Sequence, residues 1–258
     1  MSSRWRSLDR KFGDLVVALA LADAPPTRTT EPIVAVVIPA YNEAEGIVDV
    51  LHELPDRVAG LDVMPIVVVD GGTDETATVA QAAGFTTLVH VVNRGQGDAI
   101  RTGFAHALAS NADIVMTMDA DGQHRPDQMG DLLAPILADE ADYVQGSRFL
   151  GEYDDAGGAR DLGIRGFTML INRISRAGIT DCTNGFRAIR AKSLRSMHLC
   201  EPRFSAPEII IEAARNGLRV REVPVHIRSR SHGESKKPQR LAYPLGFLGV
   251  IARTAARR

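Results

Sequence analysis

Short runs of apolar, mostly β-branched residues recur along the first half of the chain. Four such runs occupy residues 33–38, 66–70, 86–92 and 113–119. Each run is apolar almost throughout, which is typical of strands that are buried on both faces of a parallel sheet. Stretches with helical spacing separate them, so the pattern predicts an α/β fold with a mostly parallel central sheet flanked by helices.

The helical stretches are recognised by the spacing of their apolar residues. Residues 97–110 follow an i, i+3, i+4, i+7 pattern, which gives one side for packing on a sheet. Another helix is predicted to begin at Pro126, and Pro135 is expected to bend or end it. Two more, over 162–178 and 207–217, each end in a glycine suited to a helix C-terminus.

A last strand is predicted over 219–227, where Pro224 indicates a sheet edge or a bulge. With 258 residues, 45% of them hydrophobic, the chain is long enough for one large α/β domain. We assign residues 32–237 to this domain, 1–31 to an N-terminal helix and linker, and 238–258 to a basic C-terminal helix or tail.

The two ends bear on location. The N-terminus has the basic start and short apolar run of a secretory signal, but Asp14 interrupts the run and favours an amphipathic helix. No stretch reaches the roughly 18 apolar residues that span a bilayer. Two cysteines are too few for a disulfide framework. We therefore expect a cytoplasmic protein, with peripheral contact at the inner face of the membrane left open because the tail can lie on anionic lipid or pack on the domain.

Charge is distributed unevenly along the chain. The net charge is −2, yet residues 213–258 hold eleven Lys and Arg against two acids, whereas 119–155 hold ten acids against two arginines. Such a molecule can hold a cation in one place and anions in another.

Polar motifs follow each of the four predicted strands. These are "PAYNE" (39–43), "DGGTD" (70–74), "NRGQG" (93–97) and "DADGQH" (119–124). The carboxyl ends of parallel strands share one edge of a sheet, where ligands bind in such folds. The four motifs therefore predict one continuous binding rim.

The strongest chemical signal is the pair Asp119 and Asp121. Side chains two apart on an extended segment point to the same side, so the two carboxylates would repel each other without a cation. Oxygen ligands of this kind suit Mg²⁺ or Mn²⁺, and Gln123 can supply a third oxygen. A lone Asp-x-Asp is a weak signal, because any acidic turn matches it.

Taken in order, the motifs form a far more specific set, which covers residues 33–237. They are "VVIPAYNEAEGI", "VVVDGGTDETA", "NRGQGDAIRTGF", "MDADGQHRPDQM", "QGSRF", "DCTNGFRAI" and "EVPVHIRSRSHGESK". Together they resemble the family 2 glycosyltransferases, and within them the dolichyl-phosphate or polyprenyl-phosphate hexose synthases. This resemblance implies a GT-A fold, a single Rossmann-like nucleotide-binding domain, and inverting transfer of a hexose from a nucleotide sugar.

The resemblance also implies roles for individual residues. The nucleotide sugar would be bound by Pro39, Tyr41, Glu43, Asp70, Asn93, Gly97, Asp119, Ala120 and Asp121. The metal would be held by Asp119, Asp121 and Gln123, and Asp121 would be essential for catalysis. Physical chemistry agrees, because a metal neutralises the charge that develops on the departing diphosphate.

Two positions depart from the family pattern. "DGGTD" is one residue shorter than the usual element and has Gly71 where a second acid often stands, and Gln96 replaces a usual lysine. The choice between a UDP- and a GDP-hexose therefore stays open.

The acceptor side of the predicted site is basic. Arginine forks and a lysine suit phosphate oxygens, and the candidates are Arg148, Arg228, Arg230, Ser235 and Lys236, with Arg148 and Arg230 also assigned to catalysis. A polyprenyl phosphate is already ionised and needs no general base. An alcohol acceptor would need one, and Asp181 and Glu208 are the available carboxylates.

Other classes of protein fit the sequence less well. The same donor chemistry aimed at a small hydroxylated acceptor is the alternative within enzymes. A nucleotidyltransferase would show an early Gly-rich loop that the chain lacks. A nucleotide-sugar sensor would bind the donor without turnover, and the full set of acidic and basic residues argues against it. No nucleic-acid partner is expected, and an oligomer is compatible with the sequence.

Overall fold

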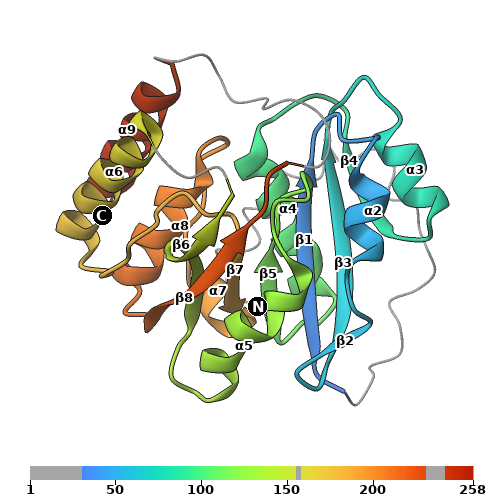
Figure 1. The fold of residues 1–258 in the computed structure, drawn as a ribbon, viewed down its shortest axis with the longest axis horizontal. Helices are drawn as coiled ribbons and strands as arrows, with labels where there is room; N and C mark the ends of the chain where they lie inside the picture. The colour runs from blue at the N-terminus through green and yellow to red at the C-terminus, as the bar shows by residue number, and fades with distance from the viewer. Residues whose placement is uncertain (1–30, 155–157, 231–241, 258) are drawn as a thin grey trace.

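The computed structural model describes residues 31–154, 158–230 and 242–257. Within them the strands form one eight-stranded sheet at the centre of the molecule (Figure 1). The strands are β1 (Ile33–Ala40), β2 (Arg57–Val58), β3 (Leu61–Asp70), β4 (Thr86–His90), β5 (Ile114–Thr117), β6 (Tyr143–Tyr153), β7 (Arg187–Arg190) and β8 (Val220–Ile227).

The sheet is parallel through the strands that were predicted first. Strands β4, β3, β1 and β5 lie side by side and run in the same direction. Strand β7 then pairs antiparallel with both β5 and β6, and β6 pairs parallel with β8 at the edge. The prediction of a mostly parallel α/β sheet is confirmed, and Pro224 does lie in an edge strand.

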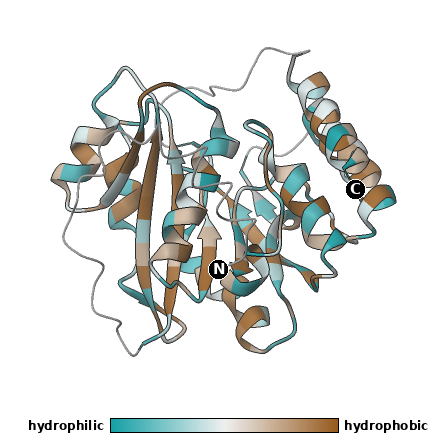
Figure 2. Cartoon of the chain, turned by 180° about the vertical axis from the view of Figure 1, so that it is seen from behind, coloured by the Kyte–Doolittle hydropathy of each residue, from teal (hydrophilic) through white to brown (hydrophobic). Residues whose placement is uncertain are grey.

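Helices cover both faces of the sheet. They are α2 (Ile47–His52), α3 (Thr76–Ala82), α4 (Gln96–Ala109), the 3-10 turn η1 (Pro126–Gln128), α5 (Met129–Leu137), α6 (Ala159–Ser175), α7 (Ala191–Leu194), α8 (Ser205–Arg215) and α9 (Ala242–Ala256). Ala35 and Val37 of β1 point into a core with α4, α6, α8 and α9, whereas Val34 and Val36 point into a core with α2, α3 and α5. Burial on both faces explains the continuous apolar strands, which are largely brown in Figure 2.

The predicted helices form close to their expected bounds. Gly103 of α4 lies directly on Val37, and a Cβ there would overlap the valine side chain, so this glycine lets the helix approach the sheet. Pro126 begins η1, and α5 continues through Pro135 but ends two residues later. The helix expected to end at Gly178 ends at Ser175, because Arg176 takes a left-handed conformation.

The C-terminal helix is part of the domain. Helix α9 lies beside α6 and packs on α8 (Figure 1), and Gly246 sits so close to the Phe204 ring that a Cβ would overlap it. Of the two expectations for the tail, packing on the domain is the one observed over 242–257. None of the described helices is both long and apolar enough to cross a bilayer. The N-terminal helix and linker predicted for 1–31 lie, except for Glu31, outside the described residues.

Candidate functional site

A cleft of about 630 Å³ opens at the carboxyl ends of the parallel strands. The loops after β4, β3, β1 and β5 form one side, which we call the rim half. Its lining residues include Pro39, Ala40, Tyr41, Glu43, Asp70, Asn93, Gly95, Gln96, Asp119, Ala120 and Asp121. The four motifs predicted to share one edge of the sheet therefore do line one cleft.

The loop after β4 is held in place by Asp70. This carboxylate accepts hydrogen bonds from His90 Nδ1 at 2.7 Å and from the backbone N–H groups of Arg94 and Gly95 at 2.9 and 2.7 Å. Burial alone would raise the pKa of Asp70, but these hydrogen bonds outweigh it and the pKa lies below its ordinary value. In the structure, Asp70 therefore stabilises the loop that carries Asn93.

The packing of the glycines after Asp70 explains why no second acid stands at position 71. Gly71, at φ 59°, lies directly on the backbone of Val92 and Asn93, and a Cβ there would overlap it. Gly72 lies against the Asn42 side chain, to which a Cβ would come within 2.5 Å. A second acid at position 71 would not fit, because the loops after β1, β3 and β4 pack against each other at this point.

Close backbone packing also requires a glycine at position 97. Its N–H donates to the Pro202 carbonyl at 2.8 Å, and a Cβ would overlap the Glu201 carbonyl. The start of α4 thus packs directly on the loop before α8. Tyr41, 38% exposed, lies at the mouth of the cleft with Glu43.

Asp119 and Asp121 both line the cleft and lie close enough for their charges to interact. The Asp119 carboxylate accepts a hydrogen bond from Gln96 Nε2 at 3.1 Å, and its backbone N–H donates to His124 Nδ1 at 3.0 Å. The buried His124 ring stacks on Phe186, which fixes the loop that presents the two acids. Gln96, at the position of a usual lysine, therefore reaches the same acid pair.

Asp121 is the more enclosed acid of the pair. Its side chain is 11% exposed, compared with 35% for Asp119. Burial, and then the neighbouring Asp119 carboxylate, raise the pKa of Asp121, while the Arg230 guanidinium opposes this change. Arg230 Nη2 lies 2.6 Å from Asp121 Oδ2, and Nη1 lies 3.8 Å from Glu43.

These residues fit a hard divalent cation. Two converging carboxylates supply the oxygen ligands that Mg²⁺ and Mn²⁺ prefer, and Asp121 already binds a positive group, Arg230. Gln123, predicted as a third ligand, has its amide nitrogen on the Arg228 carbonyl at 3.1 Å. Its backbone carbonyl also accepts from the Arg228 N–H, so Gln123 joins the acidic loop to the end of β8.

The other side of the cleft, the aromatic half, comes from different elements. Its lining residues include Thr183, Gly185, Arg187, Phe204, Tyr243 and Phe247. Phe204 contacts both Tyr243 and Phe247 edge-on, with ring centroids 5.1 and 6.4 Å apart. The sequence predictions missed this half, although the motif "DCTNGFRAI" contains three of its residues and was assigned a role only at Asp181.

The two halves meet at Gly185. A Cβ at this position would lie 2.7 Å from both carboxylate oxygens of Asp119. The Gly185 carbonyl accepts a hydrogen bond from the Thr117 hydroxyl at the end of β5. Gly185 is therefore the surface on which the Asp119 carboxylate rests.

Two predicted catalytic residues are bound to each other. Arg148 Nε donates to Asp181 Oδ2 at 2.7 Å, and both residues are buried. The other oxygen of Asp181 accepts from the N–H and hydroxyl of Thr183. This pairing argues against Asp181 as a general base, because both its oxygens already hold the loop of "DCTNGF".

The other basic residues predicted for the acceptor side do not all lie near the acid pair. Arg228 directs its side chain away from the acid pair, to Glu53 at 2.9 Å. Arg230 is the basic residue that the structure brings to Asp121. Ser235 and Lys236 lie outside the described residues.

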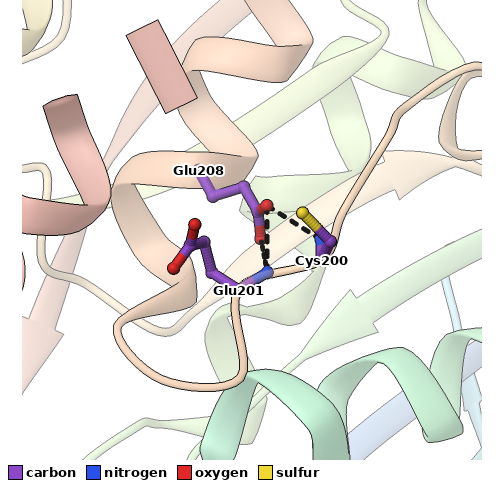
Figure 3. A group of neighbouring side chains, drawn as sticks. All are labelled: Cys200, Glu201 and Glu208. Atoms are coloured by element: carbon purple, nitrogen blue, oxygen red, sulfur yellow. Dashed lines mark hydrogen bonds between the residues drawn. The ribbon is translucent and has the colours of Figure 1, made fainter. Parts of the chain in front are cut away.

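Glu208 belongs to a separate cluster at the start of α8. It is 1% exposed and accepts hydrogen bonds from the backbone N–H groups of Cys200 and Glu201, drawn in Figure 3. Arg257 pairs with both Glu208 and Glu201, and Arg253 pairs with Glu201 at 2.6 Å. Although Cys200, Glu201 and Glu208 lie close enough to share a metal, these arginines already neutralise the carboxylates. The prediction of Glu208 as a general base is not supported, since its oxygens serve the fold.

A cleft with paired acids at the carboxyl ends of a mostly parallel α/β sheet fits a glycosyltransferase of the GT-A type. Residues 35–197 match the family model described as glycosyl transferase family 2. The chain belongs to glycosyltransferase family 2.

Named relatives cover most of the chain. An undecaprenyl-phosphate mannosyltransferase from Micrococcus luteus is 35% identical over 215 residues, with 79% of this chain and 86% of the relative covered. A UDP-N-acetylglucosamine–dolichyl-phosphate N-acetylglucosaminyltransferase from Methanococcus voltae is 30% identical, with 76% and 85% covered.

Solved structures show the same fold. Glucosyl-3-phosphoglycerate synthase from Mycobacterium tuberculosis, in complex with Mn²⁺, UDP-glucose and phosphoglyceric acid, superposes with a TM-score of 0.67 at 21% identity. The superposition covers 88% of this chain and 81% of the synthase.

Proposed function

We propose that the protein transfers a hexose, with inversion, from a nucleoside diphosphate sugar to a polyprenyl phosphate, and that it uses Mg²⁺ or Mn²⁺. The observation that carries the proposal is the pair Asp119 and Asp121 at the junction of the two halves of the cleft. Two relatives whose names specify undecaprenyl-phosphate and dolichyl-phosphate substrates support the acceptor class. The glucosyl-3-phosphoglycerate synthase complex supports a UDP-sugar with Mn²⁺.

In this proposal the rim half binds the donor. Asp119 and Asp121 would hold the metal, which would neutralise the charge on the leaving diphosphate. Arg230 would move from Asp121 to the phosphates when the metal binds, because one carboxylate cannot serve both cations equally well. Tyr41 and Asn93 lie where a nucleoside could contact them.

The reaction is a single displacement at the anomeric carbon. An oxygen of the acceptor phosphate attacks that carbon, the bond to the diphosphate oxygen breaks, and the nucleoside diphosphate leaves with the electron pair. The acceptor oxygen is already ionised near neutral pH, so positioning and electrostatics suffice. Asp181 and Glu208 are both bound by arginines and backbone N–H groups, so neither is available as a general base. This supports an acceptor that needs no general base.

A panel of substrates tests the proposal. The protein is incubated with UDP- and GDP-hexoses and Mg²⁺ or Mn²⁺, with a polyprenyl phosphate, with a small hydroxylated acceptor, or with neither. We expect nucleoside diphosphate release and a lipid-linked sugar only with the polyprenyl phosphate and metal. Transfer to the neutral acceptor alone would favour the alternative, and donor binding without any turnover would favour a sensor.

A further inference from the structure

Arg187 is a buried arginine that lines the aromatic half of the cleft. Its residue exposure is 2%, it lines the cleft, and its Nε has no hydrogen-bond partner. Among residues 31–154, 158–230 and 242–257, no carboxylate forms an ion pair with it. This makes it different from Arg148, the other buried arginine nearby, which is paired with Asp181.

The neighbours of Arg187 on the sheet are polar but already engaged. Thr117 of β5 and Gln145 of β6 are its partners across the strands. The Thr117 hydroxyl donates to the Gly185 carbonyl, the Gln145 amide donates to the Asp181 carbonyl, and Tyr143 donates to the Gln145 amide oxygen. The polar side chains next to Arg187 on the sheet therefore already form hydrogen bonds with other groups.

An unpaired buried charge is costly. Removing a guanidinium from water without a partner carries a large desolvation penalty. A ligand that supplies an anion at this position would offset the penalty. A planar guanidinium recognises phosphate oxygens particularly well, because its donors form a fixed fork.

The position of Arg187 in the fold distinguishes between the donor diphosphate and the acceptor phosphate as its ligand. The nucleotide motifs follow β4, β3, β1 and β5, whereas Arg187 is at the start of the next strand, β7, on the far side of β5. Two residues earlier, Gly185 supports the Asp119 carboxylate. An anion at Arg187 would therefore lie beside the acid pair but on the side away from the nucleotide loops.

The surroundings also suit an apolar group next to the anion. Phe204, Tyr243 and Phe247 form an aromatic cluster that lines the same half of the cleft. Phosphate next to an apolar chain is the chemistry of a prenyl phosphate headgroup. A neutral alcohol would leave the Arg187 charge without compensation.

We propose that Arg187 binds the phosphate of the acceptor in the aromatic half of the cleft. This inference rests on the proposed function and deepens it, since it assigns the acceptor site and requires an anionic acceptor.

The test uses Arg187→Met, which removes the charge at similar length, and Arg187→Lys, which keeps it. Titration calorimetry measures binding of a ten-carbon prenyl phosphate in the presence of nucleoside diphosphate and Mg²⁺, and separately binding of the nucleoside diphosphate with Mg²⁺. We expect Arg187→Met to weaken prenyl phosphate binding roughly 10- to 100-fold, Arg187→Lys to recover part of the loss, and nucleotide binding to change less than about threefold.

Urea unfolding of the same variants provides an independent readout. Because Arg187 has no internal partner among the described residues, we expect Arg187→Met to unfold at the same urea concentration as the unmodified protein or a higher one. Loss of folding in Arg187→Met would overturn the proposal, since it would mean that the charge stabilises the protein without a ligand.

The remaining outcomes separate the two proposals. Weaker nucleotide binding with intact prenyl phosphate binding would overturn the proposal by assigning Arg187 to the donor diphosphate. Unchanged binding of both ligands would also overturn it. If the unmodified protein binds the prenyl phosphate through Arg187 but transfers no sugar to it, the proposed function fails while the anion site stands.

Discussion

The two halves of the cleft balance their charges in different ways. In the rim half, each buried acid has a partner within the chain, as Asp70 has His90 and Asp121 has Arg230. In the aromatic half, Arg187 has none among the described residues. Charges that are balanced internally can hold loops in place before any ligand binds, whereas an unbalanced charge gains its stabilisation only from a ligand.

This difference separates organising residues from recognising ones. Asp70, Asp181 and Glu208 are buried carboxylates whose oxygens accept hydrogen bonds from backbone N–H groups. Because their oxygens already accept these hydrogen bonds, the three carboxylates stabilise the loops and helices around the cleft. Asp119, 35% exposed at its side chain, and Arg187 both line the cleft in which substrates are proposed to bind.

The largest effect is expected from Asp121→Asn in the rim half. The amide keeps the size of the side chain but removes one of the two charges proposed to bind the metal, so transfer should fall by about three orders of magnitude. Release of nucleoside diphosphate and formation of the glycosylated acceptor measure it. Asp127→Asn is the matched control, because this exposed acid pairs with Arg125 outside the cleft and should leave transfer unchanged. Full activity of Asp121→Asn would contradict the metal assignment.

The junction of the halves can be tested with Gly185→Ala. The added methyl group would displace the Asp119 carboxylate, whose oxygens lie 2.7 Å from the position of the new Cβ. We expect kcat/KM to fall roughly 10- to 100-fold, since misplacing a reacting group by about 1 Å has a cost of that size. Gly163→Ala on α6, where a Cβ meets open space, is the control and should leave kcat/KM unchanged. Equal activity of both variants would show that the position of Asp119 is not critical.

The rim half could be predicted from sequence because its parts are local. Each motif directly follows an apolar run, and a parallel sheet collects the ends of its strands at one edge. The apolar periodicity alone therefore predicts that Asp119 and Asp121 lie at this edge of the sheet, where they line the cleft. The turn with Gly71 was noticed as a departure, but its packing on Val92 depends on three loops that only the fold brings together.

The aromatic half could not be predicted because its parts are distant. Phe204 comes from the loop before α8, Tyr243 and Phe247 from α9, and Arg187 from a four-residue antiparallel strand too short to show a period. The same limit applies to the predicted bases. Asp181 and Glu208 were reasonable from residue type, but the arginines that engage them are 33 and 49 positions away.

Glu208→Gln tests whether this carboxylate organises or catalyses. The change leaves Arg257 with one acid instead of two and weakens the hydrogen bonds from Cys200 and Glu201, so we expect the free energy of unfolding to fall by about 2 kcal/mol. Transfer by the folded protein should be retained. Urea unfolding and steady-state kinetics, measured on the same sample, separate the two roles. A large loss of kcat with unchanged stability would restore Glu208 as a catalytic residue.

The smallest effect is expected far from the cleft, at Asp142. Hydrogen bonds from Arg219 lower its pKa from an ordinary value of 3.8 to about 2. A lowered pKa in the folded state adds stability above pH 4, and this contribution disappears as the pH falls from 4 toward 2. Because Arg219 is 46% exposed and screened by water, Asp142→Asn should cost at most about 1 kcal/mol at pH 7. Urea midpoints of the two proteins should converge only below pH 2, where Asp142 is protonated in the folded state as well, and transfer at pH 7 should be equal. A change in transfer activity would mean that charged residues far from the cleft also affect catalysis. The division between organising and recognising residues would then fail.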